Sequence, residues 1–247
     1  MKKNTEAESL FIISNPRSGS TQLVQYVRQV PGCVCFGEIF KRDTMSKELR
    51  TKVRDHETAE SLFATDSRGF WEHARTHRKG KPRIVGAKLF PRHRRGDPIW
   101  DLVFSGTPRV IHLWRNRIFD THISSLRSQT SGQWQLKKDQ QPDTQDTSRP
   151  IRFDADKYLR YRKSARREFE WVTSRLADNP KALSVEYAEI ADPAKLSLRF
   201  SEYFGVPVTL ETTLQKMTTR PALSYVENPE EAAPFVDDLL NQPDPDR

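Results

Sequence analysis

The sequence predicts an α/β fold in which a mostly parallel central sheet is flanked by helices. Short apolar runs alternate with segments of helical period, and a Gly- and Ser-bearing turn joins the first run to the first helical segment. Strands that read as continuous apolar runs are typical of parallel sheets covered on both faces. A chain of 247 residues suits one large domain with a substantial core.

The first unit is a strand, a turn and a helix. Leu10-Phe-Ile-Ile-Ser14 reads as a fully buried strand, and Asn15–Ser20 as a tight turn. Apolar residues recur at helical spacing over Thr21–Val30, and the following Pro-Gly pair ends that helix. Cys33–Phe36 is a candidate second short strand.

A highly charged region follows, at 41–82. Apolar residues show helical patterning only around Ala59–Phe63 and Phe70–His77. We expect this region to be an irregular segment that contributes to the acceptor side of a site.

Two further strand and helix units continue the alternation. Arg83–Leu89 is a strand that runs into a basic turn at Pro91–Gly96. Arg109–Trp114 is the next strand, and Ile118–Arg127 the helix after it.

The last part of the chain begins with a polar segment at 130–150, expected to be an irregular loop or lid. An apolar stripe predicts a long amphipathic helix over 155–177. Ala182–Val185 then reads as a strand, and Lys195–Phe204 as a helix ended by a glycine. Asn228–Arg247 is acidic and Pro-rich, and we expect a loosely docked tail. Residues 1–227 are therefore predicted to form the single domain.

The composition limits the kinds of binding partner and the cellular compartment that we expect for the protein. The chain has 41 Lys and Arg against 33 Asp and Glu, a net charge of +8, which favours anionic partners or reflects a basic surface. No apolar run reaches the about 20 residues of a membrane span, and the N-terminus lacks the features of a signal peptide. Cys33 and Cys35 are expected to be buried thiols, which fits the cytoplasm.

The turn after the first strand has the composition of an anion-binding loop. The first turn of a helix leaves backbone N–H groups unpaired at its positive end. Gly19 lets the backbone approach a ligand, Ser18, Ser20 and Thr21 add hydroxyl donors, and Arg17 adds a full charge. An ordinary helix cap needs only one hydroxyl, so the sequence favours a phosphate site.

The loop differs from the phosphate loop of ATP-dependent enzymes. Gly19 is followed by Ser20, not by the Lys of a Walker loop. A magnesium-nucleotide enzyme also needs an acidic residue at the end of a neighbouring strand, and the strand at Arg109–Trp114 is followed by Arg115. This arrangement favours a second anion and no metal.

Several segments together resemble PAPS-dependent sulfotransferases, which use 3′-phosphoadenosine-5′-phosphosulfate (PAPS), and particularly the bacterial trehalose sulfotransferase-like branch. Ile13–Thr21 resembles their 5′-phosphosulfate loop, and Ile111-His-Leu-Trp-Arg115 with Ser124 resembles their 3′-phosphate motif. Val185-Glu-Tyr-Ala-Glu189 and Phe200–Val206 resemble later segments of the family. The resemblance implies a P-loop-type fold with PAPS as donor. It assigns Arg17, Ser18, Gly19, Ser20 and Thr21 to the phosphosulfate, and Arg115 and Ser124 to the 3′-phosphate.

The resemblance also suggests the catalytic groups. Glu38 follows the second predicted strand, and this branch carries a Gly-Glu there whose Glu is proposed to accept the proton of the acceptor hydroxyl. Lys88 ends an apolar strand and resembles the Lys of the family's Gly-x-Lys, so Lys88 and Arg17 are candidates to stabilise the transferring group. The alternatives are a surface carboxylate paired with Lys41 or Arg42, and a Lys that extends to solvent.

We therefore expect a sulfotransferase acting on a hydroxyl of a carbohydrate, a glycolipid or another alcohol, with no metal and no nucleic acid. The resemblance is compatible with a homodimer, and the basic charge with peripheral contact to a membrane. Two alternatives stay open: an atypical P-loop kinase that needs ATP and magnesium, and a basic nucleic-acid-binding protein with salt-dependent affinity. A departure from the family, Tyr-Ala-Glu in place of Tyr-Glu-Asp, leaves Tyr187 without an assigned role.

Overall fold

The protein is described by a computed structural model, which covers residues 6–93, 96–132, 150–214 and 220–242. Its centre is a five-stranded sheet of order β2-β3-β1-β4-β5, in which every neighbouring pair is parallel. The predicted α/β fold with a parallel sheet is thus confirmed. The strands are β1 (Glu8–Ser14), β2 (Cys33–Cys35), β3 (Ile84–Leu89), β4 (Arg109–Trp114) and β5 (Ala182–Glu186).

Helices separate the strands and follow the last of them. The α-helices of the described chain are α1 (Ser20–Gln29), α2 (Arg42–Lys52), α3 (His56–Leu62), α4 (Ser67–Thr76), α5 (Ile99–Val103), α6 (Ile118–Ser131), α7 (Ala155–Leu176), α8 (Pro193–Phe204) and α9 (Pro229–Ala232). Short 3-10 helices are η1 (Pro91–His93), η2 (Tyr187–Ala191), η3 (Ala222–Tyr225) and η4 (Ala233–Phe235).

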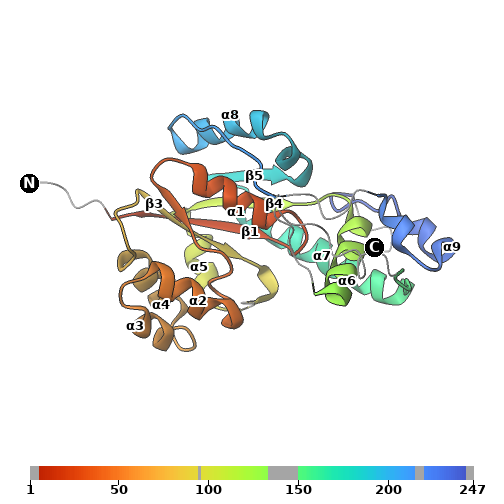
Figure 1. Cartoon of the computed structure of the whole chain (residues 1–247), viewed down its shortest axis with the longest axis horizontal. Helices are drawn as coiled ribbons and strands as arrows, with labels where there is room; N and C mark the ends of the chain where they lie inside the picture. Colours follow the sequence, from red (N-terminus) through yellow and green to blue (C-terminus); the bar gives the residue numbers. More distant parts are fainter. Residues whose placement is uncertain (1–5, 94–95, 133–149, 215–219, 243–247) are drawn as a thin grey trace, which may run out of the picture.

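Helices cover both faces of the sheet. Alternate residues of a strand point to opposite faces, so each strand contributes side chains to two cores. Leu10 and Ile12 pack with α1 and α8 on one face, while Phe11 and Ile13 pack with α4, α5 and α7 on the other. The carboxyl ends of the strands point toward the part of the molecule that holds α6, α7 and α9 (Figure 1). The sheet therefore presents its carboxyl edge to a separate cluster of helices.

The segment 41–82 is more regular than expected: the helical patterning around Ala59–Phe63 and Phe70–His77 corresponds to helices, and a further helix precedes them. The segment forms α2, α3 and α4, which gather below the sheet in the view of Figure 1. Their shared core is narrow, with Met45, Leu49, Phe70 and Trp71 buried, while most of the remaining helix surface is charged. Phe11 from β1 contacts Trp71, with ring centroids 4.9 Å apart, and this contact joins the three helices to the sheet.

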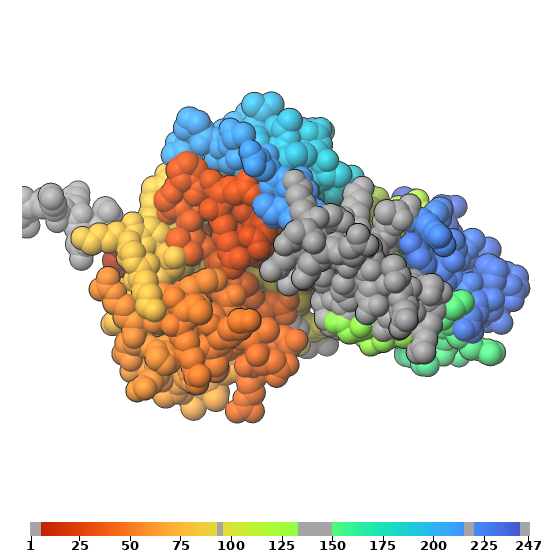
Figure 2. Space-filling view, viewed as in Figure 1, coloured from red at the N-terminus to blue at the C-terminus, as the bar shows by residue number. Residues whose placement is uncertain are grey.

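The prediction of a loosely docked tail was wrong. Residues 235–241, the C-terminal strap, run along the start of α6 and against α7. Asp238 accepts hydrogen bonds from the Tyr158 hydroxyl (2.8 Å) and Arg162 (3.2 Å). The backbone N–H of Leu240 donates to the backbone oxygen of Asn116 (2.8 Å). Figure 2 shows these dark-blue residues forming one end of the molecule with the green residues of α6 and α7.

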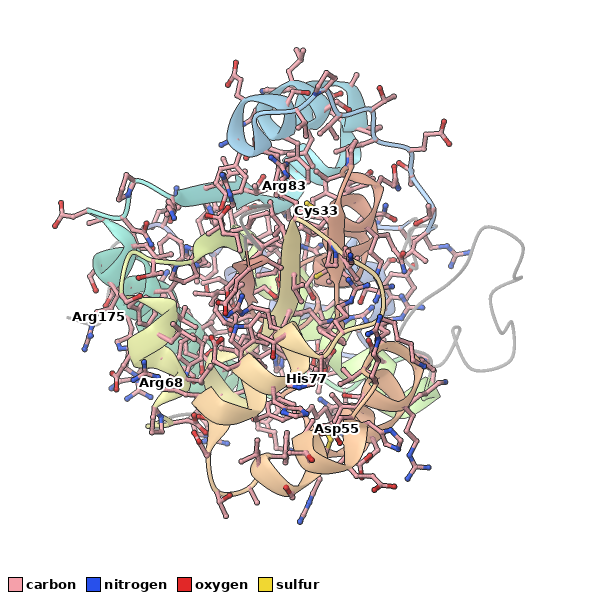
Figure 3. All side chains as sticks on the ribbon, turned by 90° about the vertical axis from the view of Figure 1, so that its left-hand side faces the viewer. Cys33, Asp55, Arg68, His77, Arg83 and Arg175 are labelled. Carbon is pink, nitrogen blue, oxygen red and sulfur yellow. The ribbon has the colours of Figure 1, made fainter. Side chains whose placement is uncertain are left out.

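The two cysteines are buried and free. Cys33 lies beside Arg83, as the labels in Figure 3 show, and burial raises the pKa of its thiol to about 11. Cys35 is deeper, and burial raises its pKa to about 12. Within the described part of the chain, no helix has the length and apolar character needed to cross a membrane.

Candidate active site

Residues that follow four different strands meet at the carboxyl edge of the sheet. The loop 15–19 follows β1, Glu38 follows β2, Lys88 lies at the end of β3 and Arg115 follows β4. The chain leaves β1 toward β2 and β3 on one side and later crosses to β4 on the other. Such a change of direction opens a crevice at the carboxyl end of the central strand, which is the usual ligand site of open α/β sheets.

The backbone of the loop has an unusual shape. Arg17 is the one non-glycine residue with positive φ in the described chain, at φ 67°. Holding an L-residue other than glycine in this left-handed conformation costs roughly 1–2 kcal/mol of conformational free energy, and such strain is often found at functional sites. Gly19 has φ 84°, and a Cβ at this position would lie 2.9 Å from Cδ2 of Tyr187. The loop therefore requires a glycine at position 19, both for its conformation and for the space.

The loop side chains divide between the crevice and the interior. Ser20 and Thr21 border the crevice with Arg17. Ser18 is 1% exposed, and its hydroxyl donates to the backbone oxygen of Asn15. The Ser18 hydroxyl is thus engaged within the loop, and the expectation that it donates to a ligand gains no support.

Arg17, Ser124 and Arg115 come together although they are far apart in the sequence. Nε of Arg17 donates to Oγ of Ser124 at 3.0 Å. Nη1 of Arg115 donates to the backbone oxygen of Arg17 at 3.3 Å. Burial, followed by repulsion from Arg115, lowers the pKa of Arg17 below its usual value. Two partly buried guanidinium groups that repel one another favour an anion between them.

A pocket of about 280 Å³, the Ser124 pocket, opens on the α6 side of this cluster. Its far wall comes from the C-terminal part of the chain, beyond residue 219. Its lining consists of Arg115, Arg117, Asp120, Ile123, Ser124, Arg220, Pro221, Ala222, Leu223, Tyr225 and Val236.

A second pocket of about 370 Å³, the Glu38 pocket, opens on the other side of Arg17. Oε1 of Glu38 lies 2.9 Å from Nζ of Lys88. The Lys88 side chain is 6% exposed and that of Glu38 is 25% exposed, so the pair is largely removed from water. The lining consists of Pro16, Arg17, Ser20, Thr21, Glu38, Lys41, Thr44, Lys88, Phe90 and Arg92.

Neither pocket resembles a metal centre. Among the described residues, no three His, Cys, Asp or Glu side chains are grouped closely enough to hold a metal ion. His112 and His122 are buried, and burial lowers the pKa of each to about 4, so both are neutral at pH 7.

Comparison with known proteins identifies the family. The model of the Stf0 sulphotransferase family matches residues 9–220. This chain belongs to that family. The match confirms the resemblance seen in the sequence and makes the protein a sulfotransferase.

A solved structure supports the fold of this sulfotransferase. A sulfotransferase from Alicyclobacillus acidocaldarius superposes with a TM-score of 0.51, at 13% sequence identity, over 94% of this chain and 92% of the other. No curated protein matches the sequence.

Sequence reasoning missed two residues that shape the site of the sulfotransferase. Asp120 forms ion pairs of 3.1 Å with both Arg115 and Arg117. Tyr187 lies under the guanidinium of Arg115, 4.4 Å from its carbon to the ring centroid, and also contacts the position of Gly19. The three-residue spacing of Arg117 and Asp120 at the start of a helix could have indicated the role of Asp120. No local sequence pattern indicated the role of Tyr187.

Two expected segments lie wholly or partly outside the described residues. The segment 130–150 is described only up to residue 132 and again from 150. The basic segment Lys216–Arg220, whose charge suggests a place near the 3′ side of the donor, is represented by Arg220 alone, which borders the Ser124 pocket.

Proposed function

We propose that this sulfotransferase transfers the sulfuryl group of PAPS to a hydroxyl of a carbohydrate, glycolipid or similar alcohol, with Glu38 as the general base. The observation that carries the proposal is the position of Arg17. Its side chain contacts Ser124 of one pocket and borders the other pocket with Glu38 and Lys88. A donor with anionic groups at both ends of one adenosine requires two such adjoining basic pockets.

The chemistry of each pocket suggests which part of the donor it binds. The 3′-phosphate binds in the Ser124 pocket, where Arg115 offers a planar pair of donors and Ser124 a short hydroxyl donor. The 5′-phosphosulfate lies over the loop, where the first N–H groups of α1 and the hydroxyls of Ser20 and Thr21 face it. Arg17 spans the two ends and neutralises charge on the departing phosphate.

In the proposed reaction, the acceptor oxygen attacks sulfur in line as the bond to the phosphate oxygen breaks. Glu38 takes the hydroxyl proton, and the desulfated donor, adenosine 3′,5′-bisphosphate, leaves with the electrons of the broken bond. Lys88 pairs with Glu38 before the acceptor binds and can turn to the sulfuryl oxygens as their charge develops. The proposed compartment is the cytoplasm, and the two free, buried thiols support it.

Calorimetry with nucleotides tests the donor. We expect adenosine 3′,5′-bisphosphate to bind without magnesium, and Arg115→Met to weaken it about 10- to 100-fold, the effect of losing a charge-assisted contact. ADP, which lacks the 3′-phosphate, should bind the wild type more weakly than the bisphosphate does. The Arg115→Met substitution should reduce the affinity for ADP only slightly. Arg68→Met, at an exposed position on α4 labelled in Figure 3, is the control and should leave binding unchanged.

Two results would overturn the proposal. One is tighter binding of ATP than of the bisphosphate, with a requirement for magnesium, which would indicate the kinase. The other is an Arg115→Met variant that loses affinity for ADP as much as for the bisphosphate, since Arg115 would then not read the 3′-phosphate.

A further inference from the structure

The Glu38 pocket carries more positive charge than the donor can neutralise. Its lining contains four cations, Arg17, Lys41, Lys88 and Arg92, and one carboxylate, Glu38, which gives 4 − 1 = +3. The phosphosulfate of the proposed donor brings one negative charge on its sulfate and one on its phosphate. The sum is then +3 − 2 = +1. Bound donor and acceptor displace water from the pocket lining, so the remaining positive charge favours an acceptor group of opposite sign.

The surplus cations lie away from the 3′ side of the donor. Lys41 follows β2 and Arg92 follows β3, while Arg115 and Ser124 follow β4. In the strand order β2-β3-β1-β4-β5, the loop after β1 separates the two groups. Lys41 and Arg92 therefore stand on the acceptor side of Arg17, beside Glu38 and Phe90.

Among the described residues, neither cation has a close, buried counter-ion. Nζ of Lys41 lies 3.7 Å from Asp43, whose side chain is 77% exposed, and such loose surface pairs contribute little. Arg92 is exposed and borders the pocket from η1. Both side chains are long enough to reorient toward a bound anion without a change in the backbone.

We infer that the acceptor carries an anionic group, a phosphate monoester or a carboxylate, in addition to the hydroxyl that receives the sulfuryl group. This inference rests on the proposed sulfuryl transfer and narrows its substrate class. Lys41 and Arg92 hold the anionic group, and Glu38 takes the proton of the reacting hydroxyl. A neutral sugar leaves a net positive charge in the pocket and is the poorer acceptor.

The test compares matched sugars as acceptors for labelled PAPS. Glucose, glucose 6-phosphate and glucuronate share the ring, and the last two distinguish phosphate from carboxylate as the anion. We expect kcat/KM for the better anionic sugar to exceed that for glucose by at least about 10-fold. Lys41→Gln and Arg92→Gln should each reduce this ratio by about 5- to 30-fold, as the loss of one charged hydrogen bond does. Arg42→Gln, an exposed neighbour outside the pocket lining, is the control and should keep the ratio.

A binding measurement gives a second readout that does not depend on turnover. The three sugars are titrated by calorimetry into protein saturated with adenosine 3′,5′-bisphosphate. We expect an anionic sugar to bind more tightly than glucose, and both glutamine variants to remove that difference. Binding of the bisphosphate itself should change less than binding of the anionic sugar, because the two cations lie on the acceptor side.

The outcomes separate this inference from the proposed function. Equal or better use of glucose, or an anion preference that both variants retain, overturns the inference and leaves sulfuryl transfer intact. Failure of every sugar to bind the saturated protein also counts against the inference. Failure of the folded wild type to bind adenosine 3′,5′-bisphosphate overturns the proposed function itself.

Discussion

Replacement of Glu38 by Gln is the sharpest test of the proposed chemistry. The amide has the shape of the carboxylate and keeps an oxygen that can accept from Nζ of Lys88, which lies 2.9 Å from Oε1 of Glu38. The substitution removes the negative charge and the ability to take a proton. It therefore separates the role of Glu38 as a base from its role in packing.

The expected loss can be estimated from the two roles. A positioned general base contributes about 10²- to 10⁴-fold to the rate, or roughly 3–5 kcal/mol of activation free energy. Lys88 is only 6% exposed and would lose its counter-ion but keep an amide oxygen as acceptor, so the substitution should cost about 1–3 kcal/mol of unfolding free energy. We expect kcat to fall at least about 100-fold. Affinity for adenosine 3′,5′-bisphosphate should stay within about threefold of the wild-type value, which is a change in binding free energy of at most roughly 0.7 kcal/mol.

The assay measures transfer of label from PAPS under single turnover, so that chemistry is observed and not product release. Glu8→Gln is the matched control. Oε2 of Glu8 lies 2.9 Å from Nε of Arg109 and the Glu8 side chain is 31% exposed, but it sits at the amino end of β1, at the opposite edge of the sheet. We expect this control to lose stability and keep its rate. A Glu38→Gln enzyme as fast as the wild type, or no slower than Glu8→Gln, would remove Glu38 from the mechanism.

Three further predictions concern stability. Asp238→Asn should lower the free energy of unfolding by about 1–3 kcal/mol, measured with urea, because a buried charge-assisted network loses its anion; an unchanged midpoint would show that the strap is not anchored there. His112 and His122 have pKa values of about 4 when folded and about 6.5 when unfolded, so the unfolded chain binds more protons between these values. Stability is therefore expected to fall as pH drops from 6.5 toward 4, and substitution of both by Gln should flatten this dependence of the urea midpoint. Cys33 and Cys35, with pKa values raised by burial to about 11 and about 12, should resist a thiol reagent at pH 8 until urea unfolds the protein.

The sequence was informative where one physical signal dominated. The apolar run Leu10–Ser14 before a Gly- and Ser-bearing turn predicted β1, the loop and α1, because a buried strand and a helix start have distinct local signatures. Arg115 and Ser124, by contrast, were singled out by the resemblance to the family's 3′-phosphate motif. The structure brings both to Arg17.

The parts that were missed depend on contacts between distant residues. In α2, only Met45 and Leu49 are buried, so the apolar stripe was too thin to outweigh the surrounding charges. The C-terminal strap is held by polar groups: Asp238 bonds to Tyr158 and Arg162, whose positions in the chain bear no periodic relation to it. Polar anchoring leaves no pattern in hydropathy, and an acidic, Pro-rich composition suggested a free tail instead.

The C-terminal strap has a practical consequence for handling the protein. Val236 borders the Ser124 pocket, and the backbone of Leu240 is bonded to Asn116, the neighbour of Arg115. A change that loosens the strap would therefore also alter the wall of this pocket. Stability and nucleotide affinity should be measured together in strap variants such as Asp238→Asn.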